Sequence, residues 1–385
     1  MAPRLTIVLP LRGRHLFTFR FLWHANKCRL PYHFLIADGK VNEAVACRLE
    51  NSRKDFPELD IEYVRYPDDI NYSRFFTKMA DVMQRVRTPY AMLADNDDFL
   101  GLDGIEGSLD FLDQNPNYIC ARGHALNFSV RTPSFAYGRI CGKFNRFYMH
   151  KEDKTVTAST VTERLRQGGL CHAVYNAVYR TAAPIRIWRE IAEMDLTDLM
   201  LYEDFFALRT LTLGKIHTHR DTISYYSQAA TSITHEPLRD WASHLLRSRF
   251  TSDVHALIKR IACAAAETDH VDVGSIAENV RTTLEHYYGN FLSTNYGLAS
   301  QIKRRIRARW PRLVNVVQNR PRFSVKRERA AVFSRLRSAG ASRQRIDVIR
   351  GEIASIQSAL SSHAFADFAS PFLSIAQGDS SREWV

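Results

Sequence analysis

Short apolar runs and helical patterns alternate along the first 120 residues. Continuous apolar runs, typical of buried strands, cover residues 5–9, 33–37 and 90–94. Helical patterns cover residues 15–26, 41–54, 73–86 and 103–114, and Ser73 is the expected N-cap of the third. Such alternation predicts an α/β fold with helices on both faces of a mostly parallel sheet. Ligands bind these sheets beyond the carboxyl ends of the strands, where Pro10, Asp38 and Asp95 fall.

The pattern changes toward the C-terminus. Between residues 125 and 235 it is mixed, with helices predicted at 157–167, 184–194 and 202–213 and one or two short strands within 215–226. From residue 236 onward helical periods dominate. We therefore expect an α/β domain at residues 1–235 and a helical region at residues 236–385.

One apolar seam stands out in the helical region. Its members are spaced three and four residues apart: Ile346, Ile349, Ile353, Ile356 and Leu360. The spacing predicts a helix that either packs onto the body of the protein or pairs with a second copy of the chain.

The composition is that of a globular protein. Of the 385 residues 45% are hydrophobic and 24% charged, which excludes wholesale disorder and collagen-like classes. No apolar run is long enough to cross a bilayer, and the first one lacks the small-residue cleavage site of a secretion signal. The six cysteines form no CxxC pair, so neither a disulfide framework nor a zinc cluster is expected. These features predict a cytoplasmic protein.

The positive charge belongs to one segment. The chain has a formal net charge of +12, and residues 301–350 contain 16 Lys and Arg side chains against the two acids Glu328 and Asp347. Trp310 and Phe323 lie among these cations. A nucleic-acid surface, an anionic membrane surface and a solvated helix all fit this pattern.

Three carboxylates directly follow the apolar run at residues 90–94. They are Asp95, Asp97 and Asp98. Like charges this close repel, and burial raises their pKa, unless a cation neutralises them. Mg²⁺ or Mn²⁺ suits such oxygen ligands and keeps coordination sites for substrate phosphates. The alternative is a solvated acidic turn before the helix near residue 103.

The order of these motifs resembles that of family 2 glycosyltransferases, which have the GT-A fold. The similarity covers about residues 4–235: a first strand ending in Pro10, a second ending in Asp38, a later one ending in residues 95–98, the pair Glu203 and Asp204, and the segment 225–232. The resemblance implies an inverting, metal-dependent transfer of a sugar from a nucleotide-diphosphate sugar to a glycan or lipid-linked acceptor. It further implies a role in surface polysaccharide or lipopolysaccharide assembly.

The resemblance also implies the residues of a donor site. Asp38 would bind the nucleotide base, beside the backbone of Pro10, Leu11 and Arg12. An Asp before Gly39 is equally typical of a turn, and the loop Leu11-Arg-Gly-Arg14 departs from the family's small polar run.

The sugar and diphosphate contacts would come from later residues. Asp95 would bind the ribose next to Asn96, and Asp97 would hold the metal with Asp95. Lys78 would contact the donor, although a solvated helix face explains it as well. His235 would complete the metal site, with His217 and His219 as alternatives. Asp98 would support the loop.

The acceptor side is implied by the Glu-Asp pair and a preceding segment. Asp204 would be the general base that removes the acceptor proton, and Glu203 would contact the acceptor. A carboxylate in the first turn of a helix is stabilised by the helix dipole, which would keep Asp204 ionised. The same position also suits an ordinary helix N-terminus. His172, Tyr175 and Asn176 would form the acceptor wall.

Two other functions stay open at this point. A sugar-nucleotide nucleotidyltransferase also uses metal-binding acids on an α/β sheet, but a long glycine-rich loop after the first strand is missing. A nucleic-acid-binding protein would use the basic segment and would leave the acidic run unexplained. We expect the segment at 301–350 to bind the inner face of the membrane or an anionic glycan instead.

Overall fold

The computed structural model describes residues 3–131, 140–149, 154–196, 199–228, 249–296 and 325–372. Its strands are β1 (Leu5–Leu11), β2 (His33–Asp38), β3 (Asp60–Arg65), β4 (Tyr90–Leu93), β5 (Phe99–Leu100), β6 (Tyr118–Arg131), β7 (Lys143–Met149), β8 (Val178–Arg180) and β9 (Lys215–Gln228). Its longer helices are α1 (His15–Lys27), α2 (Glu43–Glu50), α3 (Tyr72–Arg85), α4 (Leu102–Gln114), α5 (Val161–Gly168), α6 (Ala182–Met194), α7 (Leu199–Leu213), α9 (Phe250–Asp269), α10 (Val273–Tyr296), α13 (Val325–Ser338), α14 (Arg343–Leu360) and α15 (His363–Ala369).

The strands form one mixed sheet in the order β3-β2-β1-β4-β8-β6-β9-β5, with β7 paired to β6. The first four strands of this order are parallel, as is the pair β6–β9. The pairs β4–β8, β6–β8, β5–β9 and β6–β7 are antiparallel. The α/β class and the helical C-terminal region are thus confirmed, and the sheet is mixed, with short antiparallel pairs joining its two parallel parts.

Strand β1 shows why this part of the chain is buried on both faces. Val8 points into a cluster with Phe76 and Met79 of α3. The alternate residues Ile7 and Leu9 join Phe19 of α1 in a second cluster on the other face. Successive side chains of a strand point to opposite faces, so a strand covered on both sides reads as one continuous apolar run.

Two helix starts differ from the sequence-based prediction. Helix α3 is capped by Asn71, whose Oδ1 accepts a hydrogen bond from the backbone N of Arg74 at 2.9 Å, and not by Ser73. Helix α7 begins at Leu199, so Glu203 and Asp204 lie in its second turn. The helix-dipole argument for a carboxylate in the first turn therefore does not apply to them.

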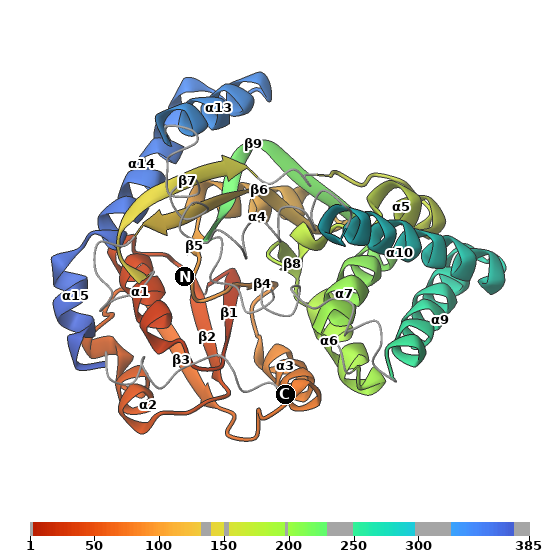
Figure 1. Cartoon of the computed structure of the whole chain (residues 1–385), viewed down its shortest axis with the longest axis horizontal. Coiled ribbons are helices and arrows are strands. Elements are labelled where there is room, and N and C mark those ends of the chain that lie inside the picture. Colours follow the sequence, from red (N-terminus) through yellow and green to blue (C-terminus); the bar gives the residue numbers. More distant parts are fainter. Residues whose placement is uncertain are drawn as a thin grey trace.

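The C-terminal helices pack at two ends of the sheet (Figure 1). Helices α9 and α10 lie beside α5, α6 and α7, and residues of α9 such as Leu257 share a core cluster with Phe205 of α7. Helices α13 to α15 lie beside α1 and β7 at the other end. The expected domain boundary near residue 235 and the first part of the basic segment, residues 301–324, fall outside the described ranges.

The apolar seam of α14 is used inside the chain. Ile349, Ile353 and Ile356 are buried in a cluster with Phe128 of β6 and Phe147 of β7. This packing is the first of the two alternatives for the seam, because its side chains contact the chain's own sheet. An oligomer through residues 346–360 stays a prediction.

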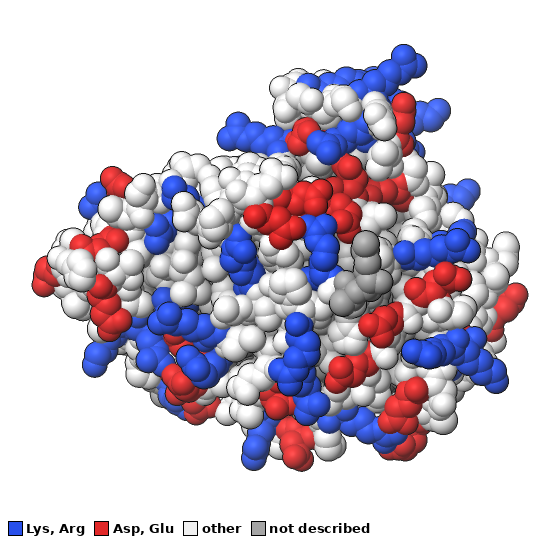
Figure 2. All heavy atoms as spheres, turned by 180° about the vertical axis from the view of Figure 1, so that it is seen from behind, with Lys and Arg blue, Asp and Glu red and all other residues white. Residues whose placement is uncertain are grey.

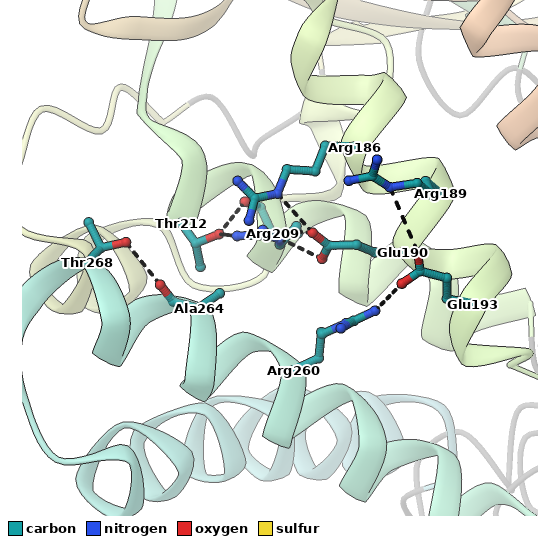
Figure 3. A network of polar contacts seen from close by, with 9 residues as sticks. All are labelled: Arg186, Arg189, Glu190, Glu193, Arg209, Thr212, Arg260, Ala264 and Thr268. Carbon is teal, nitrogen blue, oxygen red and sulfur yellow. Dashed lines mark hydrogen bonds and ion pairs between the residues drawn. The ribbon is translucent and has the colours of Figure 1, made fainter.

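A polar network joins α6, α7 and α9 (Figure 3). Buried Arg209 donates to both carboxylate oxygens of Glu190 at 2.8 Å, and Arg186 donates to the same carboxylate at 3.0 Å. Near the surface, Arg260 of α9 pairs with Glu193. The Arg209–Glu190 ion pair thus fixes α7, the helix that carries Glu203 and Asp204, against α6. Across the described ranges, no helix combines the length and the apolar character needed to cross a membrane.

Candidate active site

A cavity of about 310 Å³ opens at the carboxyl ends of β1 and β4. The parallel strand order β3-β2-β1-β4 reverses its direction of winding between these two strands, and α/β proteins bind ligands at this switch point. Residues from four segments line the cavity: Pro10 to Arg14; Asp95 to Asp98; His172, Val174, Tyr175 and Asn176; and Tyr202, Glu203, Phe206 and Ala207. Tyr72, Phe75, Ser227 and Gln228 complete it.

The acidic loop after β4 is held in a defined conformation. The backbone N of Asp95 donates to the hydroxyl of Tyr225 at 2.9 Å, and Asp98 Oδ1 accepts from the backbone N of Gln228 at 2.6 Å. Asp97 Oδ2 pairs with Arg14 Nη2 at 2.8 Å. Each carboxylate therefore has a distinct environment, and a solvated acidic turn does not describe this loop.

The turn between β1 and α1 brings Arg14 to the acidic loop. Gly13 and Arg14 both have left-handed backbone conformations, with φ of 72° and 56°. Such a conformation is costly for a residue with a side chain. The ion pair with Asp97 accompanies this strain, as expected at a functional turn. Arg14 was noted in the sequence only as a departure from the family pattern, so its role at the site was missed.

A second arginine holds the acidic loop through its backbone. Arg20 of α1 is fully buried and donates to the backbone oxygen of Asp97, and its other contacts include Gln228 Oε1 at 2.7 Å. Its guanidinium also lies over the ring of Phe99, 4.8 Å from the centroid. Burial lowers the pKa of Arg20 to about 10, so it stays charged at neutral pH.

Negative charge on the acidic loop is unfavourable despite the two arginines. Burial raises the pKa of Asp95 to about 6, and the neighbouring charge of Asp97 adds to the rise while Arg14 opposes it. Burial and the charges of Asp97 and Asp95 raise the pKa of Asp98 well above its usual range. Carboxylates in this situation attract a further cation.

The acidic loop fits a divalent cation that is shared with a substrate. Among the described residues no three His, Cys, Asp or Glu side chains are grouped to hold a metal ion by themselves. A Mg²⁺ ion that also binds the phosphates of a substrate needs only one or two protein carboxylates, because the phosphates supply further oxygen ligands. Asp95 and Asp97 both face the cavity and match this donor set. His235 lies outside the described ranges, and His217 stacks on Phe111 with ring centroids 3.8 Å apart.

The predicted donor residues fall into two groups. Pro10, Leu11, Arg12, Asp95 and Asn96 line the cavity as expected. Asp38 and Lys78 do not.

The side chains of Asp38 and Lys78 are both buried. Asp38 accepts from the hydroxyl of Tyr63 at 2.8 Å and from the backbone N of Lys40 at 3.0 Å. Lys78 pairs with Asp69 and donates to the backbone oxygen of Leu11 at 3.1 Å. Lys78 thus supports the cavity wall, and the solvated face considered for it is wrong, since its side chain is 2% exposed.

The predicted acceptor wall lines the cavity. His172 and Tyr175 come from the loop after α5, and the Nδ2 of Asn176 donates to the backbone oxygen of Leu93 at 3.2 Å. Tyr175 packs against Phe206 of α7, with ring centroids 5.4 Å apart. Glu203, on the same helix, also faces the cavity.

Asp204 lies behind this wall and not in it. Its side chain is fully buried, and Oδ1 accepts a hydrogen bond from Nε2 of His172 at 2.7 Å. Oδ2 accepts from the hydroxyl of Tyr288 in α10. His172, therefore, is the cavity-facing member of this group. Tyr288 was missed because it lies 84 residues along the chain, in a part with no motif that points to the site.

The chain was compared with protein families, curated protein sequences and solved structures. No protein-family model and no curated protein sequence matches the chain. Among solved structures, TarS 1–349 of S. aureus in complex with UDP-GlcNAc matches 99% of this chain and 89% of its own, with a TM-score of 0.49 and 10% identity. TarS of S. aureus in a longer form matches with a TM-score of 0.48 and 11% identity, and the chain spans 54% of it.

A third solved structure is the mannosyltransferase PcManGT from Pyrobaculum calidifontis in complex with GDP-Man and Mn²⁺. It matches 88% of this chain and 86% of its own, with a TM-score of 0.38 and 13% identity. Likenesses this weak do not fix an activity, so the cavity itself must indicate the function.

Proposed function

We propose that the chain is a glycosyltransferase that takes a nucleotide-diphosphate sugar as donor and a hydroxyl group as acceptor. One observation carries this proposal: three groups of residues meet around one cavity at the switch point of the sheet. They are the acidic loop at residues 95–98, the loop after β1 with Arg12 and Arg14, and the wall formed by residues 172–176 and 202–207. Its volume of about 310 Å³ is at the lower end of the ~300–1,000 Å³ typical of ligand pockets. The family resemblance of the sequence motifs names the same reaction.

The donor side is the half of the cavity between β1 and β4. Asp95 and Asp97 would hold Mg²⁺ or Mn²⁺, which supplies positive charge for the diphosphate of the donor. Arg12 and Arg14 line the same half, and Arg14 keeps Asp97 in place. Guanidinium groups bind phosphate oxygens well because their donors are planar and permanently charged.

The acceptor side is the wall built from α7 and the loop after α5. Aromatic rings such as those of Tyr175 and Phe206 suit the apolar faces of a sugar, while Glu203 and Asn176 offer hydrogen-bond partners for hydroxyl groups. A hydroxyl that enters from this side would attack the anomeric carbon opposite the departing diphosphate. Direct displacement of this kind inverts the anomeric configuration.

Thermal unfolding with nucleotides tests the proposal. UDP, GDP, CDP and dTDP are each added with and without Mn²⁺, and at least one diphosphate should raise the melting temperature in a Mn²⁺-dependent way, because a ligand that binds only the folded state stabilises it. Asp97→Asn should abolish the Mn²⁺-dependent part. Asp110→Asn, an exposed charge removal on α4, is the matched control and should leave it intact. No shift with any diphosphate would refute the proposal.

A further inference from the structure

A buried carboxylate and a cavity-facing imidazole form a pair on the acceptor side. Asp204 is fully buried, whereas the side chain of His172 is 21% exposed and lines the cavity. A carboxylate can only accept hydrogen bonds, so the contact of 2.7 Å places the hydrogen on Nε2 of His172. This hydrogen bond fixes both the orientation and the tautomer of the ring.

The pair is held by two helices, α10 and α7. Tyr288 of α10 donates to the second oxygen of Asp204, so the carboxylate cannot turn away from His172. The ring of Tyr287 packs edge-on against the imidazole, with centroids 5.2 Å apart. Asp204 itself comes from α7, whose position is fixed by the buried Arg209–Glu190 ion pair. The imidazole therefore meets the cavity in one defined orientation.

We propose that His172 is the catalytic base of the transfer and that Asp204 and Tyr288 are positioning residues that act through it. This inference rests on the proposed function. The acceptor oxygen forms a bond to the anomeric carbon, and the bond from that carbon to the diphosphate breaks, with its electron pair going to the diphosphate oxygen. The proton of the acceptor hydroxyl passes to Nδ1 of His172, because Nε2 carries the hydrogen donated to Asp204.

The geometry explains how Asp204 contributes while it is out of reach of the acceptor. His172 becomes positively charged as it takes the proton, and the adjacent carboxylate stabilises that charge. The attraction is weaker before the proton moves, so the contact favours the transition state over the bound substrate. A base oriented by a third group is the usual arrangement at sites of proton transfer.

Glu203 is the competing candidate for the base, since its carboxylate also faces the cavity. The two alternatives predict opposite results in one assay. The assay measures release of nucleoside diphosphate from UDP-GlcNAc, UDP-glucose, GDP-mannose and dTDP-glucose with water as acceptor, alongside the melting-temperature shift that the diphosphate produces.

His172→Gln is the main variant, because its amide can still donate to Asp204 while it cannot take a proton at neutral pH. We expect the rate of release to fall by about 10²–10⁴-fold, the usual contribution of a general base. The KM for the donor and the diphosphate-induced shift should stay unchanged. His172→Ala should lose as much, and added imidazole should restore part of the rate.

The positioning residues give a second readout. Asp204→Asn should lower kcat with the donor KM unchanged, and imidazole should not restore the rate, because the native ring still fills the site. Tyr288→Phe should have a smaller effect in the same direction. His286→Gln, an exposed histidine of α10 that contacts Asn290, is the matched control and should react at the wild-type rate.

Two results would overturn the inference, for different reasons. If His172→Gln releases diphosphate at the wild-type rate while Glu203→Gln does not, the base is Glu203 and the proposed function still stands. If none of the four nucleotide sugars is bound or cleaved by the wild-type chain, the proposed function fails and the inference fails with it.

Discussion

At the scale of single residues, the molecule uses arginine side chains to compensate buried acids. Arg14 and Arg20 hold the acidic loop of the cavity, and Arg209 holds Glu190 between α6 and α7. A buried carboxylate that loses its partner keeps the cost of desolvation without the attraction that offset it. These arginines therefore contribute to the stability of the fold, as the apolar core does.

The Arg209–Glu190 pair allows a direct test of this account (Figure 3). Arg209→Met should lower the free energy of unfolding by about 3–5 kcal/mol, because Glu190 stays buried with its main partner gone. The measurement is urea unfolding followed by circular dichroism.

Arg260→Met is the matched control in the same network. It breaks a surface pair in which both side chains are about half exposed, and such pairs contribute about 0–1 kcal/mol. Equal losses in the two variants would show that burial of the Arg209–Glu190 pair does not matter.

At this scale, the sequence predicted which residues line the site better than it predicted the contacts that these residues make. The residues 95–97, 172, 175, 176 and 203 were expected at the site and do line one cavity. The burial of Asp204 could not be anticipated, because its cover comes from Tyr288 in a distant helix. Lys78 was placed on a solvated face or the donor site, while its true partner Asp69 lies in a loop without a recognisable pattern.

At the scale of elements, α14 caps the start of α4. The N-cap of α4 is Gly101, which has no side chain to accept a hydrogen bond. Glu352 of α14 takes this role: its carboxylate accepts from the backbone N of Asp103 at 3.4 Å and from the hydroxyl of Tyr226 at 2.6 Å. Burial raises the pKa of Glu352 to about 7, and the charge of Asp103 adds to the rise.

This raised pKa predicts a pH dependence of stability. The folded state holds a proton on Glu352 that the unfolded state has already released above its ordinary pKa of about 4.5. The contribution of Glu352 to stability is therefore complete below pH 4.5 and is lost as the pH rises to about 7. In Glu352→Gln, which cannot ionise, the unfolding free energy should decline less over this range than in the wild type. Parallel curves for the two proteins would contradict the assignment.

Long elements were predictable from the sequence, whereas short or composite ones were not. Continuous apolar runs predict strands β1 and β2, and the helical spacing of apolar residues predicts helix α1. Strand β8 has only three residues, too few to show a period, and it makes the centre of the sheet antiparallel. The sequence therefore showed no sign of the antiparallel strand that makes the sheet mixed.

At the scale of the whole molecule, the described part of the basic segment includes helix α13. Helix α13 projects from the body, and Figure 2 shows Lys and Arg side chains along it, while both signs of charge mix over the rest of that face. Lys326, Arg327 and Arg337 of this helix are exposed. We propose that this surface binds anionic lipid and so holds the cavity near a lipid-linked acceptor.

Vesicle sedimentation tests the role of this surface. The chain should bind vesicles that contain phosphatidylglycerol and release them as salt is raised, because surface attraction is screened by salt. Replacing Lys326, Arg327 and Arg337 together by Gln should weaken binding by about 10²-fold, at roughly 1 kcal/mol for each basic residue near the membrane. The equal-charge control replaces the exposed Arg29, Arg53 and Lys54. Binding that is equally weak in both triple variants, or insensitive to salt, would contradict the proposal.

The central claim is that the cavity between β1 and β4 binds a nucleoside diphosphate through a cation on the acidic loop. The most direct measurement is a crystal soaked with Mn²⁺ and the diphosphate that stabilises the protein most, examined by anomalous scattering at the manganese edge. We expect a single strong peak in contact with carboxylate oxygens of Asp95 or Asp97 and with the diphosphate. A peak elsewhere, or a diphosphate bound outside this cavity, would contradict the account.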